Sequence, residues 1–87
     1  LMRQPLAELT DRTNVATAKR AEEIARTVEG VRGTHKAHAR KSGSRVYVDM
    51  HVEVPPTMSV ADAHIVSGKV KSAIRGAMPE VANVLIH

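Results

Sequence analysis

The sequence predicts a two-layer α+β domain in which two helices cover one face of a three-stranded sheet. Two segments, about residues 11–28 and 60–77, repeat apolar residues at helical spacing. Residues 45–54 alternate strictly between apolar and polar side chains, which is typical of a strand with one buried face. With a further short strand expected at 81–86, the predicted order is helix, strand, strand, helix, strand.

Length and composition restrict the chain to one small domain with a thin core. Among its 87 residues, Tyr47 is the single residue of the Phe, Trp and Tyr class, so aliphatic side chains must fill the core. The absence of Cys excludes disulfides and thiolate ligands, and it leaves His and carboxylates as donors for a metal. No stretch approaches the roughly 20 apolar residues of a membrane span. A core this small favours oligomerisation.

The first predicted helix has an apolar stripe and a polar face, and Gly30 follows it as a stop signal. Residues 1–10 are interpreted as a linker, and residues 11–87 as the domain. The apolar stripe comprises Val15, Ala18, Ala21, Ile24, Ala25 and Val28.

The two middle strands predict an antiparallel hairpin. Residues 31–40 form its weaker strand, and the turn falls at 41–44, where Gly43 can adopt a positive φ. The Pro55–Pro56 pair ends the second strand, because proline cannot donate to the ladder. Ser59 is then a favourable N-cap for the second helix.

The histidines lie where residues distant in sequence can converge. His35 opens the first strand of the hairpin, His51 lies on the polar face of the second, and His87 ends the last strand. His64 is one turn into the second helix, off its apolar stripe. Because strand starts and strand ends meet at the edge of a small sheet, these imidazoles predict a zinc-type site.

Two carboxylates accompany His51 on its strand face, Asp49 and Glu53. Either can supply an oxygen ligand or accept a hydrogen bond from a ligating imidazole, and Glu53 is the preferred candidate. Both also fit solvent-facing charges on a hairpin.

The placement of His35 depends on a strand irregularity. Strict alternation puts it on the core side with Ala37 and Ala39, so it joins His51 only if the strand bulges at Gly33–Thr34. His38, at odd spacing from His35, should point the other way and is expected to be a surface residue.

Four runs of the sequence together resemble the cytoplasmic C-terminal domain of cation diffusion facilitators, which transport divalent metal ions. They are VRGTH ending at His35, ARKSGSRVYVDMHVEV ending at Val54, MSVADAH ending at His64 and VLIH ending at His87. The resemblance covers nearly the whole chain. It implies an α-β-β-α-β, metallochaperone-like (ferredoxin-like) fold. It also implies a homodimer on the cytoplasmic side of a membrane, below the transmembrane domain of the same transporter, with residues 1–10 following the last membrane helix.

The resemblance further implies a regulatory domain, not an enzyme, that binds divalent cations near the dimer interface to control metal export. Carried over position by position, the family's ligand histidines fall on His35, His51, His64 and His87. Zinc suits this donor set best, and manganese, iron(II), cobalt and nickel also fit it. Lys36 stands where some members have an acidic residue, Arg3 where the family usually has Asp, and the chain stops at His87, before the family's usual acidic ligand. These departures favour a weaker site over a two-metal site.

Two other functions fit parts of the sequence. Net charge is +4, and Arg40, Lys41 and Arg45 cluster at the hairpin turn, as in a basic nucleic-acid-binding α/β domain. Without stacking aromatics no nucleic-acid partner is expected, and the basic turn fits anionic lipid or an acidic partner instead. A dimerisation module with incidental histidines is the other alternative. No Ser-His-Asp arrangement or Gly-rich phosphate loop suggests an enzyme.

Overall fold

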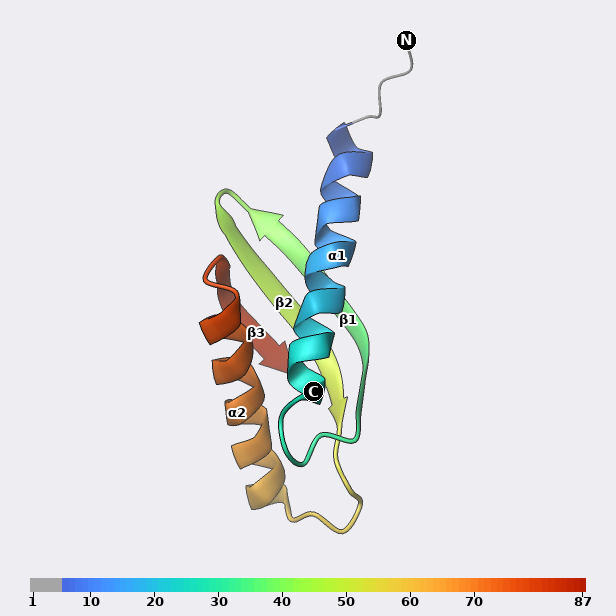
Figure 1. Cartoon of the computed structure of the whole chain (residues 1–87), viewed down its shortest axis with the longest axis vertical. Helices are drawn as coiled ribbons and strands as arrows, with labels where there is room; N and C mark the ends of the chain where they lie inside the picture. Colours follow the sequence, from blue (N-terminus) through green and yellow to red (C-terminus); the bar gives the residue numbers. More distant parts are fainter. Residues whose placement is uncertain (1–5) are drawn as a thin grey trace.

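A computed structural model describes residues 6–87, with side chains from residue 12 onward, as two packed layers. The elements in chain order are α1 (Leu6–Arg26), β1 (Gly33–Ser42), β2 (Arg45–Glu53), α2 (Val60–Ala77) and β3 (Val81–Ile86). Both helices pack on the same face of the sheet (Figure 1). The predicted α-β-β-α-β two-layer fold is therefore confirmed.

Residues 1–5, which include Arg3 and half of the predicted linker, lie outside the described residues. Within the described part of the chain, no helix has the length and apolar character needed to cross a bilayer.

The sheet has β2 at its centre, in the order β1-β2-β3. β1 pairs with β2 antiparallel, and β3 pairs with β2 in parallel, so α2 serves as the crossover connection. The alternation predicted for β2 is confirmed: Val46, Val48 and Met50 are buried under the helices. Its intervening side chains occupy the opposite surface of the sheet, called here the outer face.

The core is aliphatic, as the composition predicts. α2 contributes the buried residues Val66, Val70 and Ile74. The buried residues among the described side chains of α1 are alanines, whose small side chains let this helix lie close to the sheet, and Ile24 packs partly buried beside them. The buried alanines of α1 are Ala18, Ala21 and Ala25.

Val15 departs from the predicted apolar stripe, since it is 55% exposed. It borders a shallow groove between α1 and β1, where it faces Ala37 and Ala39. The alanine side chains of the edge strand are too small to shield Val15 from solvent. This turn of α1 is therefore only partly buried.

The observed bounds of α1 differ from the predicted ones at both ends. The helix begins at Leu6, earlier than the predicted Asp11, and α-helical structure ends at Arg26. Beyond that point the N–H groups of Thr27 and Val28 donate three residues back, to the carbonyls of Ile24 and Ala25, which tightens the last turn.

The second helix has the predicted bounds, 60–77. Ser59 is its N-cap, and the Ser59 hydroxyl oxygen accepts a 3.0 Å hydrogen bond from the Asp62 N–H. Pro79 follows the C-cap Met78 and cannot continue the helix.

The hairpin turn is tighter than predicted. Ser42 and Arg45 are direct partners, which leaves a two-residue loop of Gly43 and Ser44. Gly43 has φ +63° and Ser44 has no positive φ, the pattern of a type II′ turn with glycine first.

Candidate metal-binding site

Three imidazoles form a row across the outer face of the sheet. His35 and His51 are direct cross-strand partners in the antiparallel pair. His87 lies beside His51 on the other side, because its N–H donates to the Met50 carbonyl at 3.0 Å. Adjacent rings are stacked, with centroids 5.1 Å apart in both pairs and interplanar angles of 27° and 29°. His35, His51 and His87 are called the histidine row below.

A β-bulge places His35 in this row. Partners shift from His35–His51 to His38–Asp49, so β1 has one more residue than β2 between these pairs. Lys36 lies in the bulge with φ +54°, a left-handed conformation that is uncommon for a residue with a side chain. The predicted irregularity exists, but it lies two residues after Gly33–Thr34.

The same bulge corrects the prediction for His38. Since His38 is paired with Asp49, and Asp49 shares the outer face with His51, His38 lies on the same face as the histidine row. Its side chain is exposed, as expected, but it does not point to the opposite side from His35. Ala37 and Ala39 pack against the core, and His38 lies opposite them, as strict alternation predicts. The bulge instead moves His35 to the outer face, so it is the predicted relation between His35 and His38 that fails.

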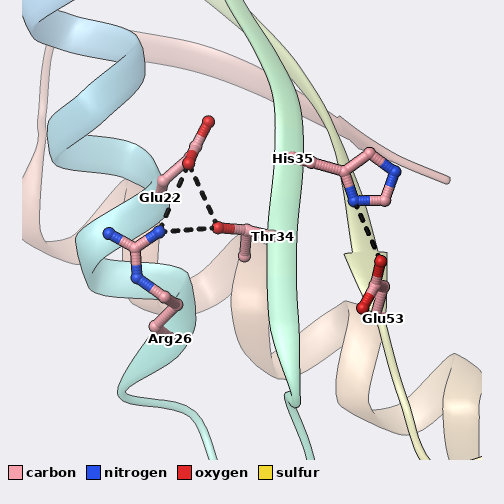
Figure 2. A network of polar contacts seen from close by, with 5 residues as sticks. All are labelled: Glu22, Arg26, Thr34, His35 and Glu53. Atoms are coloured by element: carbon pink, nitrogen blue, oxygen red, sulfur yellow. Dashed lines mark hydrogen bonds and ion pairs between the residues drawn. The ribbon is translucent and has the colours of Figure 1, made fainter.

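Glu53 contacts the histidine row at His35, as Figure 2 shows. The Glu53 Oε1 atom lies 3.3 Å from His35 Nδ1. Gly33 is the cross-strand partner of Glu53, and a Cβ at Gly33 would lie 3.4 Å from Glu53 Oε2. The carboxylate therefore lies within ordinary van der Waals contact of the Gly33 position. A proton held on Nδ1 by this carboxylate leaves the lone pair of Nε2 free for a cation.

A second polar network fixes the start of β1 from the helix side (Figure 2). The Arg26 guanidinium donates to the Thr34 hydroxyl oxygen at 3.0 Å and to Glu22 Oε2 at 3.3 Å. The Thr34 hydroxyl in turn donates to Glu22 Oε2 at 3.2 Å. Because adjacent residues of a strand point to opposite faces, anchoring Thr34 to α1 directs His35 to the outer face.

The surroundings of His51 favour its neutral form. Partial burial is the largest effect that lowers its pKa, followed by the positive charges that His87, His35 and Lys36 can carry. Asp49 acts in the opposite direction, but the net pKa remains below the usual value. A neutral imidazole is the form of histidine that can bind a metal.

His64 lies apart from the row. It is exposed near the start of α2, in the helix layer, and among the described residues no contact joins it to another predicted ligand. It is also absent from the groups that shift the pKa of His51. The structure thus brings together four of the predicted residues and leaves His64 separate.

The donor types of the row fit zinc and similar ions, but the rings are stacked side by side across the sheet. Their interplanar angles are only 27° and 29°. Accordingly, in the part of the chain with described side chains, no three His, Cys, Asp or Glu residues are grouped closely enough to hold an ion. Ligation requires side-chain rotation or donors from elsewhere.

An open groove of about 420 Å³ adjoins the row on the outer face. His38, Tyr47 and Asp49 line its β1–β2 side, and Asn83 and Leu85 of β3 line the other. Strict alternation places His38 opposite Ala37 and Ala39, but the sequence carried no signal for the groove that His38 helps to line.

Comparisons with known proteins identify the family. The profile described as "Cation efflux protein, cytoplasmic domain" matches residues 15–87. Metal tolerance protein 2 of Oryza sativa subsp. japonica is 42% identical over 60 residues, which are 69% of this chain and 15% of that protein. Metal tolerance protein C1 of Arabidopsis thaliana is 40% identical over 97% of this chain and 18% of its own length. The cation-efflux pump FieF of Pectobacterium atrosepticum is 31% identical over 67% of this chain and 19% of its own.

Solved structures agree with the sequence comparisons. A variant of MamM CTD superposes with a TM-score of 0.79 and 32% identity, covering 83% of this chain and 89% of that one. Other structures of MamM CTD variants are described as nickel and manganese forms, each with a TM-score of 0.79 and 30% identity. The chain spans less than a fifth of the length of the curated relatives named above. The resemblance read from the sequence is confirmed, and the chain belongs to the family of cation efflux protein cytoplasmic domains, the C-terminal domains of cation diffusion facilitators.

Proposed function

We propose that this domain dimerises and binds divalent metal cations, and that binding controls metal export by the transporter to which it belongs. The observation that carries the proposal is the histidine row, whose central imidazole has a lowered pKa and two stacked neighbours. The nickel, cadmium and manganese forms of MamM CTD variants support the class of ligand. Zinc suits imidazole and carboxylate donors best, and manganese, iron(II), cobalt and nickel are the other candidates.

In this proposal His35, His51 and His87 supply nitrogen donors, and Glu53 either orients His35 or adds an oxygen. A bound cation would attract these nitrogen and oxygen donors and so stabilise side-chain conformations in which they point to one position. His51 belongs to both ring pairs, so small rotations of its neighbours bring their nitrogens towards a common point. The hairpin holds the backbone of the site fixed, and only side chains need to move.

Dimerisation completes the proposed site. A single copy holds no preassembled group of three donors among its described residues, which supports a contribution from a second copy. His64 is exposed at the surface of α2 and is available as such a ligand. In this proposal the dimer has two arrangements, one with the two copies apart and one with them drawn together around the metal. Metal binding favours the second by no more than the difference in metal affinity between the two arrangements. Residues 1–10 connect this movement to the transmembrane domain, with the present domain on the cytoplasmic side.

Calorimetric titration of chelator-stripped protein with zinc, manganese and iron(II) tests the proposal. We expect His51→Ala and His87→Ala each to weaken binding by about tenfold or more, since ligand and near-ligand changes typically cost 10–100-fold. His38→Ala is the matched control, because His38 lies on the same face outside the row, and it should leave affinity unchanged. His64→Ala decides whether α2 contributes a ligand.

Thermal unfolding provides an independent measurement. At free metal about 100-fold above the dissociation constant, linkage adds roughly 2.7 kcal/mol to the free energy of unfolding. For a domain of this size that corresponds to a rise of roughly 10–20 °C in the unfolding midpoint. If no metal gives heat or a thermal shift, metal sensing by this chain is disproved.

A dimerisation module without metal response is the second candidate function. It is favoured by the absence, in the described part of the chain, of a preassembled group of three His, Cys, Asp or Glu residues that could hold an ion. A dimer whose dissociation constant is the same with and without each metal would establish this alternative.

A further inference from the structure

The β1–β2 hairpin ends in three exposed cations that surround the turn: Arg40, Lys41 and Arg45. They are called the basic tip below. The segment 36–48 contains no acidic residue. Among residues with described side chains, ion pairs join only Arg26 to Glu22 and His35 to Glu53. The charges of the basic tip are thus not neutralised by contacts within the domain.

The cations of the basic tip encircle the turn. Arg40 lies on the outer face opposite Tyr47, with its guanidinium carbon 5.7 Å from the ring centroid. Lys41 pairs with the inward-facing Val46 and so belongs to the other face of the hairpin. At the turn itself, Gly43 and Ser44 carry little or no side chain, so nothing bulky keeps the flanking charges from a flat surface.

The basic tip lies at a distinct end of the domain. In Figure 1 the hairpin turn is at the end where α1 begins, and the loop between β2 and α2 is at the opposite end. The histidine row lies towards that opposite end, because His35 is near the start of β1 and His87 follows the end of β3. The basic tip is therefore not part of the proposed metal site. In the proposed function, the start of α1 is also the end connected to the membrane domain.

We propose that the basic tip docks on anionic phospholipid headgroups of the cytoplasmic leaflet. This inference rests on the proposed function for the position of the domain beneath a bilayer. The chemistry of the contact comes from the basic tip itself: exposed cations that are not paired with a carboxylate lose no ion pair when they meet a negative surface. Each Lys or Arg near such a surface strengthens binding roughly fivefold.

Nucleic acid is a poorer match to the same surface. Single-stranded nucleic acid is bound by successive exposed aromatic rings between basic residues. Here Tyr47 is the single Phe, Trp or Tyr residue of the chain, and it is half-buried beside Arg40.

Vesicle sedimentation of the metal-free, 87-residue chain tests the proposal. Vesicles of phosphatidylcholine with phosphatidylserine should bind the protein, and vesicles of phosphatidylcholine alone should not. We expect the triple variant Arg40→Gln, Lys41→Gln, Arg45→Gln to bind roughly 100-fold more weakly, from three charges at about fivefold each. Binding by the parent chain should fall as salt is added, because exposed charges are screened.

The matched control removes the same charge elsewhere. Lys19, Arg20 and Lys69 are exposed helix residues, and their joint replacement by glutamine should leave most of the vesicle binding intact. Equal loss in both triple variants would show that net charge alone is responsible, and would overturn the proposal. Failure of the parent chain to bind phosphatidylserine vesicles, or binding only to single-stranded RNA, would overturn it as well.

Metal titration of the basic-tip variant separates the two proposals. Its metal affinity should equal that of the parent chain, because the substitutions lie outside the histidine row. If the parent chain binds the vesicles but does not respond to any metal, the proposed metal-sensing function is rejected. The contact between the basic tip and anionic lipid is then still supported.

Discussion

His51 stands between two other imidazoles on the outer face, and its lowered pKa has a consequence for stability. In the unfolded chain this side chain titrates near pH 6.5. In the folded chain it remains neutral to lower pH, so between the two pKa values the unfolded state binds more protons. Stability is therefore fully present above about pH 6.5 and is lost as the pH falls through the folded-state pKa.

We predict that the thermal midpoint of the metal-free protein falls as the pH is lowered from 7.5 towards 5, and that His51→Gln reduces this fall. Glutamine is polar and does not titrate, so it removes the proton-binding difference at this position. Unfolding scans with chelator present, at matched ionic strength, measure the effect. His64→Gln is the matched control, because it makes the same replacement at an exposed histidine outside the histidine row. A His51→Gln profile parallel to that of the parent chain would contradict this account.

Gly30, in the loop between α1 and β1, lies where this loop packs against α2. Gly30 has φ +95°, and a Cβ there would lie 3.0 Å from Val66 Cγ2 and 3.4 Å from Met58 Cε. The backbone must therefore adopt a left-handed conformation and also approach the start of α2 closely. Gly43 shares the positive φ but has no atom within 4 Å of the same position.

The two glycines make a matched pair for a stability measurement. Gly30→Ala combines left-handed strain with overpacking against Val66, so we expect a loss of about 2–3 kcal/mol in the free energy of unfolding. Gly43→Ala has only the strain, and we expect a loss of about 1 kcal/mol. Urea denaturation of both variants gives the comparison. Equal losses would mean that the close approach of α2 to the loop contributes nothing.

The strands show where sequence reasoning succeeds and where it cannot. β2 alternates between apolar and polar residues, and α2 carries an N-cap and a proline stop, so local chemistry defines both elements. The bulge in β1 depends instead on Lys36, a residue with no preference for positive φ. Its position follows from pairing with β2 and from the Thr34 anchor, which are tertiary contacts. His35, His51 and His87 were predicted to converge because strand ends meet, and His64 stays separate because a helix forms the other layer.

A single copy of the domain leaves large apolar side chains in water at several elements, as expected for a thin core that is completed by association. Val60 at the start of α2 is 89% exposed, and Ile65 and Leu85 are more than half exposed. If dimerisation and metal binding are coupled, as proposed, each must strengthen the other by the same factor. Such coupling is typically 5–150-fold.

We therefore predict that zinc lowers the dissociation constant of the dimer by a factor in about that range. Sedimentation equilibrium over a series of protein concentrations, with chelator or with saturating zinc, measures both constants. His87→Ala is the informative variant, because it removes one donor of the row while the apolar contacts remain. It should dimerise like the parent chain in chelator and lose the response to zinc. If His87→Ala instead dissociates the metal-free dimer, the row contributes to the interface itself, and the separation between dimerisation and sensing is wrong.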